Sequence, residues 1–236
     1  MIQAMRFSDP LIRGALIRRY KRFLADAELD TGEMVTAHCA NSGSMMGLTE
    51  PGAEVWLSPA RNPDRKLRYS WEMIRIGDGL VGVHTGHPNR IVEEAVRDGR
   101  IAELTGYDDI RREVRYGKNS RIDLLLEGNG RPACYVEIKS VTLRRDGRAE
   151  FPDAVTARGT KHLGELAGVV AQAGRAVMLY LVQREDCEKF AVAADIDPAY
   201  AEALAAARAA GVEALCHACR LTTDAIELDR ALPLDL

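Results

Sequence analysis

The hydrophobic pattern of the chain changes near residues 84–88, and this change limits the possible folds more than any other feature. From Leu11 to about Val83 the sequence reads as short strands separated by turn residues, with no convincing helix. About five strands in some seventy residues suit a small closed barrel of the OB type, a fold often used to bind single-stranded nucleic acid. Beyond residue 88, strands alternate with helices, as in α/β domains. We therefore expect an α/β protein, α+β overall, with an OB-like β-barrel domain over 1–84 and an α/β domain over 85–236.

The second domain begins with a predicted helix that Asn89 can cap and that runs to about Leu104. A second helix is expected over 156–172, and an alanine-rich third begins at Pro198 and stops before Gly211. The strands expected in this domain cover residues 110–116, 120–126, 133–143, 176–182 and 212–219. No internal repeat and no low-complexity linker interrupts this order.

The segment from residue 120 to residue 140 carries the pattern with the most chemical meaning. Asn129-Gly130 is a hairpin turn signal between two apolar strands. Folding the chain back at this turn places Asp123 opposite residue 136 or 137. Because side chains alternate along a strand, Glu137 and Lys139 face the same side. Two carboxylates and one amine are therefore expected together at one end of the sheet.

This combination suits a divalent cation and phosphodiester chemistry. Mg²⁺ or Mn²⁺ takes oxygen ligands and is typically held by one or two carboxylates, here Asp123 and Glu137, while substrate phosphate completes the shell. A metal-bound water is a stronger nucleophile, and Lys139 can orient it or stabilise developing charge. Glu113 is a possible third acid, although a solvated carboxylate beside neighbouring arginines explains it equally well. The alternative for the whole motif is a solvated hairpin face.

Two groups of cations lie outside this motif. Four basic side chains occupy five positions: Arg18, Arg19, Lys21 and Arg22. On the predicted helix over 156–172, the face opposite the apolar one carries Arg158, Lys161, His162 and Glu165. Both groups can contact the phosphate backbone of DNA, and solvated charged surfaces are the alternative for each.

Composition restricts the partners and the compartment. The formal charge is −3, and residues 171–236 hold 6 basic and 11 acidic side chains, so any polyanion must meet a local patch. No stretch has the length and apolarity of a signal peptide core or a membrane span. We therefore expect a cytoplasmic protein, with DNA as partner and homo-oligomer formation left open.

Two further motifs have an ordinary and a functional interpretation. Cys216-His217-Ala218-Cys219 could begin a zinc site, but no second ligand pair follows, and buried free cysteines are the favoured interpretation for all five. The loop over 38–45, His-Cys-Ala-Asn-Ser-Gly-Ser-Met, could bind an anion through its backbone amides. An ordinary turn is the favoured alternative.

Several of these segments together resemble the sugar fermentation stimulation protein A family over nearly the whole chain. The stretches FPDAVTARGTKHL and SRID…VEIKSVTL carry most of the similarity, supported by LIRRYKRFL and by residues 38–43. The resemblance implies an OB-like barrel joined to a PD-(D/E)xK nuclease-like domain with a mixed sheet. Ala40 and Ser42 depart from the family's HxPNTG-like loop, in which Pro and Thr are usual at these positions.

The resemblance further implies non-sequence-specific DNA binding and a regulatory role in maltose metabolism. Asp123, Glu137 and Lys139 match the nuclease triad, with Glu113 as the upstream acid. Two hypotheses follow. The protein is either a DNA-binding protein with a metal-dependent phosphodiesterase centre or a non-catalytic DNA-binding regulator. The intact triad favours the enzyme, because two carboxylates repel a polyanion unless a cation lies between them.

Overall fold

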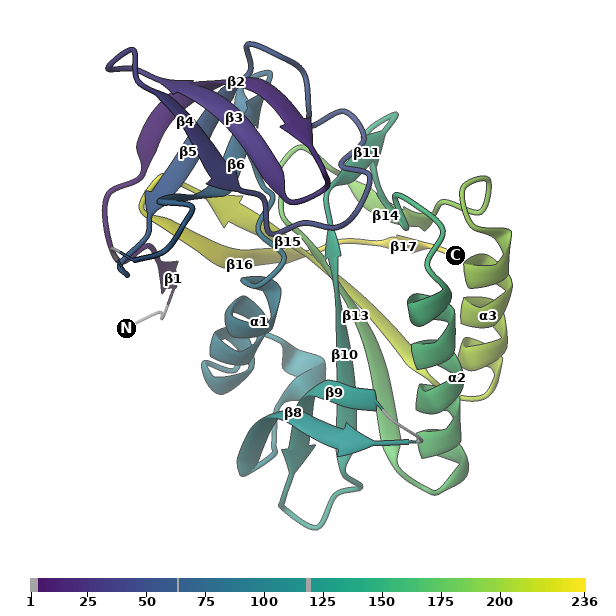
Figure 1. The fold of residues 1–236 in the computed structure, drawn as a ribbon. Coiled ribbons are helices and arrows are strands. Elements are labelled where there is room, and N and C mark those ends of the chain that lie inside the picture. The colour runs from purple at the N-terminus through teal and green to yellow at the C-terminus, as the bar shows by residue number, and fades with distance from the viewer. Residues whose placement is uncertain (1–3, 63, 118–119) are drawn as a thin grey trace.

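A computed structural model describes residues 4–62, 64–117 and 120–236. Figure 1 shows a barrel at the N-terminal end of the chain, set against a larger domain in which helices flank a central sheet. A small four-stranded sheet lies beside the central one and consists of β11 (Leu143–Arg145), β12 (Arg148–Phe151), β14 (Lys189–Val192) and β17 (Leu234–Asp235). Among the described residues, no helix is long and apolar enough to cross a membrane.

The N-terminal strands close into a barrel. They are β2 (Ile12–Tyr20), β3 (Leu24–Leu29), β4 (Met34–His38), β5 (Glu54–Pro59), β6 (Tyr69–Ile76) and β7 (Gly79–Gly82). The sheet order is β4-β3-β2-β5-β6-β7, and a parallel pairing of β4 with β6 closes the first five strands into a ring. Every second residue of β3 is buried, which is the alternation that a barrel interior requires. The expected OB-like barrel is confirmed.

The larger domain is built on a mixed sheet of seven strands. These are β1 (Met5–Arg6), β8 (Asp109–Tyr116), β9 (Ser120–Glu127), β10 (Cys134–Val141), β13 (Arg175–Val182), β15 (Glu213–Leu221) and β16 (Ala225–Ala231), in the order β1-β16-β15-β13-β10-β9-β8. The central pairs β10–β13 and β13–β15 are parallel, and the outer pairs are antiparallel. Residues 5 and 6 therefore pair within this sheet, although the sequence places them in the barrel segment.

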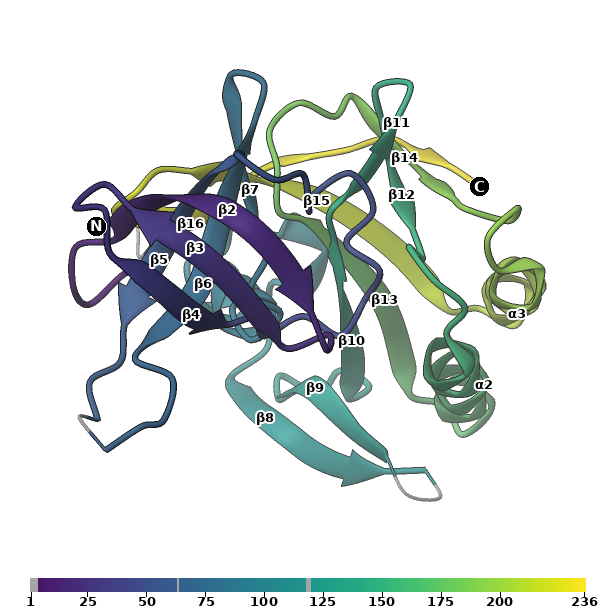
Figure 2. The same ribbon diagram turned by 45° about the horizontal axis from the view of Figure 1, so that its top comes forward.

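Helices cover both faces of the central sheet (Figure 2). They are α1 (Pro88–Arg97), α2 (Ala157–Ala171) and α3 (Pro198–Ala209), with a 3₁₀ turn at Ala102–Leu104. The apolar side of α1 packs with Leu124, Val136 and Leu179 in one core cluster. Helices α2 and α3 pack with Leu125 and Tyr180 in a second cluster on the other face. The alternation of β9 and β10 thus separates the side chains that face α1 from those that face α2.

The first helix is shorter than predicted and is capped differently. It ends because Gly99 adopts a φ of 68°, and the amides of Gly99 and Arg100 bond back to the carbonyls of Val96 and Ala95. Asn89 lies within the first turn, and its side chain does not cap the helix. The expected cap is therefore wrong, because this side chain is hydrogen-bonded to β9.

The cysteines are free and buried in the described structure, as favoured by the sequence. Cys216 belongs to the core cluster on the α2 side of the sheet, whereas Cys219 belongs to the cluster on the α1 side. Because the two thiols point into different cores, they cannot hold one zinc ion together. The buried-cysteine interpretation of this motif is confirmed.

The loop over 39–45 makes hydrogen bonds both to the barrel and to the larger domain. The guanidinium of Arg19 donates to the carbonyls of Asn41, Gly43 and Ser44. On the other side, the Asp153 carboxylate accepts from the amide of Met45 at 2.9 Å, and the Asp153 carbonyl accepts from the Ser44 hydroxyl at 2.6 Å. The loop is thus a clamp between β2 and the segment that leads into α2.

Removing the Asp153 side chain is expected to destabilise this clamp. Asp153→Ala leaves the Met45 amide without its partner, which should lower the free energy of unfolding by about 1–3 kcal/mol in urea denaturation. Asp9→Ala is the matched control, because Asp9 pairs with Arg61 at 3.4 Å on an exposed surface, and its loss should cost less than about 1 kcal/mol. Equal effects of the two changes would show that the clamp adds nothing to stability.

Candidate functional site

Asp123 ends the regular pairing of β9 with β10. The paired register ends at Leu124 opposite Val136, so the next position along β10 is Glu137. There the Asp123 carboxylate accepts the amide of Ile138 at 2.7 Å, taking the place of a strand hydrogen bond. The predicted fold-back of the hairpin is therefore observed, and it fixes Asp123 beside the β10 segment that carries Glu137.

Glu137 is the most enclosed carboxylate of the site, with 3% of its surface exposed. Its Oε1 accepts from Lys139 Nζ at 2.7 Å and also contacts His162 Nδ1 on α2. Its Oε2 is buried and has no hydrogen-bond partner among the described residues. A buried carboxylate oxygen without a partner is costly unless a ligand completes its contacts, so the Oε2 atom fits a cation site.

The electrostatics of the two acids differ. Burial raises the pKa of Glu137, but the hydrogen bond from His162 and the charge of Lys139 outweigh it, so the net shift is downward and the group is ionised at neutral pH. Burial and repulsion from Glu137 raise the pKa of Asp123 to about 6. Hydrogen bonds from Ile138 and Asn89 offset part of that rise. Binding of a cation by this pair would therefore be coupled to loss of the Asp123 proton.

Asn89 is a member of the site that the sequence did not reveal. Its Nδ2 donates to Asp123 Oδ1 at 2.8 Å and lies 3.4 Å from Glu113 Oε1. Glu113 is exposed on β8 and has a φ of 53°, a conformation uncommon for residues other than glycine. One amide thus connects the predicted third acid to Asp123, and Glu113 lies at the rim of the site.

Helix α2 supplies the cationic side of the site. Thr156 caps it by accepting the Gly159 amide, and the buried Asp197 accepts the Thr156 amide, so the start of the helix is fixed. His162 is 4% exposed and faces Glu137, which differs from the predicted outward position because this turn of the helix packs against β10. Arg158 and Lys161 are exposed, as expected.

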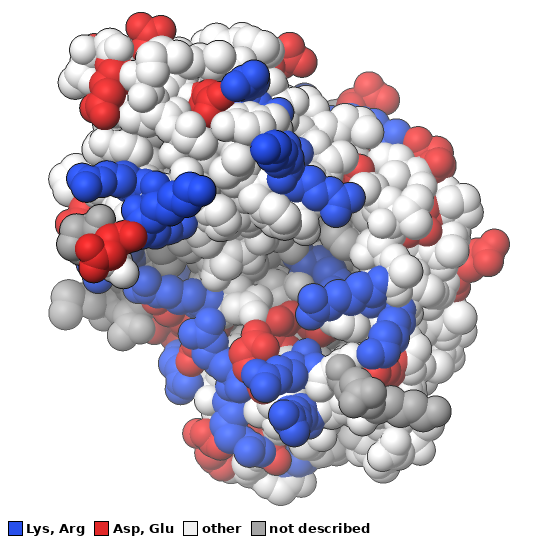
Figure 3. All heavy atoms as spheres, in the orientation of Figure 1, with Lys and Arg blue, Asp and Glu red and all other residues white. Residues whose placement is uncertain are grey.

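The predicted barrel cations have different surroundings. Arg18 is exposed, pairs with Asp26 at 2.9 Å and lies over the Tyr20 ring. Lys21 and Arg22 are exposed in the turn after β2. Arg19 is the exception, because its donors hold the loop of the clamp. Figure 3 shows Lys and Arg side chains around a hollow between the barrel and the larger domain, with acidic side chains inside it.

The titration of Asp123 predicts a pH-dependent stability. Its folded pKa is above the ordinary value of 3.8, so its contribution to stability is complete at low pH and is lost as the pH rises through about 6. With chelator present, Asp123→Asn should therefore become more stable relative to the wild type by about 3 kcal/mol as pH rises through that window. The titration of Glu137 contributes to the stability of both proteins and therefore cancels in the difference between them. Urea denaturation at several pH values measures this difference, and a difference independent of pH would contradict it.

Family models match the sequence of both parts of the chain. The family model described as the SfsA N-terminal OB domain matches residues 17–83, and the model described as the sugar fermentation stimulation protein RE domain matches residues 86–225. The chain belongs to the sugar fermentation stimulation protein family. The resemblance found in the sequence is thereby confirmed.

Similar members of the SfsA family match nearly the whole chain. The sugar fermentation stimulation protein homolog of Paramagnetospirillum magneticum is 62% identical over 232 residues, which are 98% of this chain and 98% of the relative. The homolog of Rhodospirillum centenum is 60% identical, over 98% of this chain and 99% of its own. Among solved structures, Pyrococcus furiosus SfsA in complex with Ca²⁺ matches with a TM-score of 0.90 and 26% identity over 100% of both chains.

Proposed function

We propose that this protein binds DNA with little sequence preference and hydrolyses its phosphodiester bonds with a divalent cation, Mg²⁺ or Mn²⁺. The observation that carries the proposal is the buried, unpartnered Oε2 of Glu137 beside Asp123. A structural salt bridge would use both carboxylate oxygens or expose one to water. An ionised oxygen held without a partner, next to a second acid, is instead suited to a cation.

The residues divide into separate roles. Asp123 and Glu137 would hold the cation, which when bound lowers the pKa of a water and offsets charge on the phosphate. Lys139 lies 2.7 Å from Glu137, close enough to donate to a phosphate oxygen or to an attacking water. Asn89 holds the Asp123 carboxylate in place, and His162 does the same for Glu137. Glu113, at the rim, shares the Asn89 amide with Asp123 and would be the third acid of the site.

Three features support DNA as the substrate. The hollow of Figure 3 is bordered by cations from both parts of the chain, which suits a phosphate backbone. The barrel belongs to a fold class that often binds single strands. The relative from Pyrococcus furiosus was solved with Ca²⁺, an oxygen-seeking cation that two carboxylates can hold. A role for Arg18, Lys21, Arg22, Arg158 and Lys161 in backbone contact follows from their exposure.

A cleavage assay tests this function. Purified protein should cut single- or double-stranded DNA with Mg²⁺ or Mn²⁺, and chelator should stop the reaction. If DNA is bound but remains intact with either ion, the second hypothesis stands: a non-catalytic DNA-binding regulator linked to sugar metabolism. One observation favours that outcome, because Lys139 and His162 both occupy Oε1 of Glu137 and already neutralise part of its charge.

A further inference from the structure

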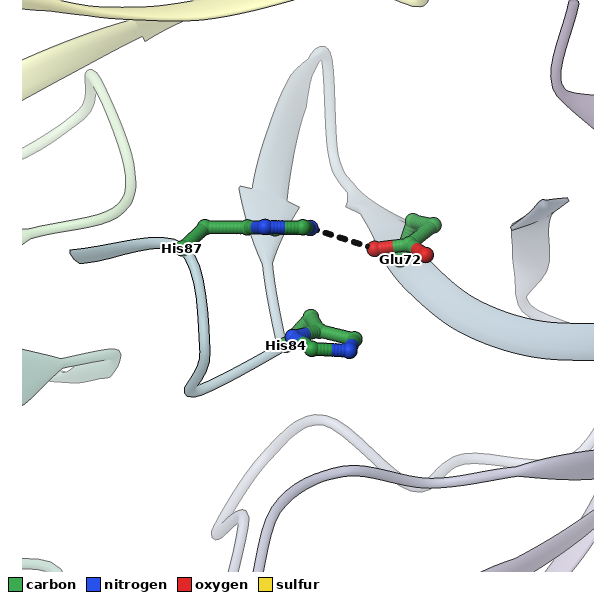
Figure 4. A group of neighbouring side chains, drawn as sticks. All are labelled: Glu72, His84 and His87. Carbon is green, nitrogen blue, oxygen red and sulfur yellow. Dashed lines mark hydrogen bonds and ion pairs between the residues drawn. The ribbon is translucent and has the colours of Figure 1, made fainter. Parts of the chain in front are cut away.

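A second group of possible metal ligands lies away from the acidic site, at the joint between the barrel and α1. Glu72 is on β6, His84 follows the last barrel strand, and His87 is the cap position of α1. One ligand atom from each of the three lies within 4.8 Å of the others. Figure 4 shows both imidazole rings reaching toward the Glu72 carboxylate from the same side.

Glu72 is a buried anion with few partners. It is 4% exposed, and its Oε1 accepts from the Ser58 hydroxyl at 2.5 Å while Oε2 contacts His87 Nε2 at 2.6 Å. Burial raises the pKa of Glu72, but contact with His87 outweighs it, so the pKa is lowered and the group is ionised. Among the described residues, His87 is its sole ion-pair partner. A buried carboxylate without a permanent cation favours binding of one.

The histidines offer two imidazole nitrogens. Burial lowers the pKa of His84, which keeps its ring in the neutral form that metals bind. Its Nδ1 accepts the Gly86 amide at 3.1 Å, and its Nε2 has no hydrogen-bond partner among the described residues. Phe7 contacts the His87 ring edge-on, with ring centroids 5.8 Å apart. Phe7 and Glu72 thus hold the His87 ring, whereas the Gly86 amide and the stacked His87 ring hold His84.

We propose that Glu72, His84 and His87 form a second metal site that takes a borderline divalent cation such as Zn²⁺ or Co²⁺. Two imidazoles and one carboxylate form a ligand set that suits zinc, with one position left for water. Mg²⁺ and Ca²⁺ prefer oxygen ligands, so the nitrogen-rich set separates this site from Asp123 and Glu137.

Binding requires one local rearrangement. The rings of His84 and His87 are stacked at 4.3 Å with planes 19° apart, so their Nε2 lone pairs do not converge on one point as they stand. The torsion that turns a histidine ring about its Cβ–Cγ bond has a broad energy profile. Turning His84 aims its Nε2 between the other two ligands, and the Gly86 contact is given up in exchange for the metal bond.

The position of the site indicates what the cation would do. The three ligands come from the barrel, from the connection after it and from the start of α1, and Phe7 adds the segment after β1. A pocket of about 190 Å³ beside Glu72 and His87 admits solvent to the remaining coordination position. A bound cation would therefore tie the two parts of the chain together, independently of catalysis.

Cobalt titration of the full chain tests the site without any DNA. The double variant Asp123→Asn/Glu137→Gln, freed of metal by chelator, should still bind one Co²⁺ and show a visible absorption band. His84→Gln and His87→Gln in this background should each weaken Co²⁺ binding at least about tenfold, since the loss of even an outer-shell partner of a ligand commonly costs that much. His217→Gln is the matched control and should bind Co²⁺ normally, because His217 is not one of the three ligands.

Thermal unfolding supplies a second measurement. Zn²⁺ at one hundred times its Kd should raise the Tm of the double variant by roughly 5–10 °C, and this rise should disappear in His84→Gln. A double variant that binds no Co²⁺ would overturn the proposal. Equal Co²⁺ binding by His84→Gln and the control would overturn it as well, as would an equal loss in His217→Gln. None of these results depends on whether the protein cuts DNA.

Discussion

Replacing Glu137 by glutamine is expected to abolish metal-dependent cleavage of DNA while the fold survives. Glutamine keeps the size and shape of the side chain but removes the charge from the buried oxygen that has no partner among the described residues. Losing this ligand should reduce the cleavage rate by about a hundredfold or more, since the cation's electrostatic effect is worth several kcal/mol. Divalent-ion affinity should fall in parallel, as measured by calorimetry.

The fold of this variant needs its own control. Lys139 loses a charged partner but can still donate to the glutamine oxygen, and 14% of its side chain is exposed, so we expect a stability loss of about 1–3 kcal/mol rather than unfolding. Glu150→Gln makes the same chemical change in a carboxylate that is also 3% exposed and pairs with Arg145 outside the site. This control should lose stability but keep its cleavage rate and its metal affinity. If both variants lost cleavage equally, the assignment of Glu137 would fail.

DNA affinity separates the enzyme from the regulator. Without metal, Asp123 and Glu137 repel phosphate, so Glu137→Gln should bind DNA as well as the wild type or slightly better. With Mg²⁺, the wild type should bind more tightly than without it, and the variant should lose this gain. If the DNA affinity of the wild type does not depend on Mg²⁺ and no divalent ion supports cleavage, the enzyme hypothesis fails and the regulator hypothesis stands.

Local patterns in the sequence were sufficient to predict the centre of the site. The turn at Asn129-Gly130 sets the hairpin, and strand alternation puts Glu137 and Lys139 on one face, which the structure bears out. The barrel was predicted in the same way from short alternating strands. These features depend on neighbours a few residues apart, so the sequence alone determines them.

Features that depend on packing between distant segments were missed. His162 lies at the edge between the polar and apolar faces of α2, and only the docking of this helix against β10 turns it inward. Asn89 looked like a helix cap because the hairpin that it contacts is more than thirty residues away in sequence. The last strands, β16 and β17, were also missed. The role of Arg19 was hidden for the same reason, because the carbonyls it holds belong to another loop.

The final prediction concerns the phosphate contacts of the barrel. Arg18, Lys21 and Arg22 are exposed, and the triple change to alanine should weaken binding to all DNA sequences alike. Arg19 is left intact because its loss would damage the clamp.

Salt dependence gives the size of the effect. Each phosphate contact contributes about 0.9 to the slope of log K against log salt on duplex DNA, so the triple variant should lower the slope by about 2–3. Arg13, Arg75 and Arg220 changed together to alanine remove the same charge from ion-paired arginines outside the proposed set of phosphate contacts, and this control should keep the wild-type slope. Fluorescence anisotropy with several unrelated sequences measures both. An unchanged slope in the triple variant would show that these barrel cations do not contact DNA. A preference of several kcal/mol for one sequence would contradict recognition through the phosphate backbone.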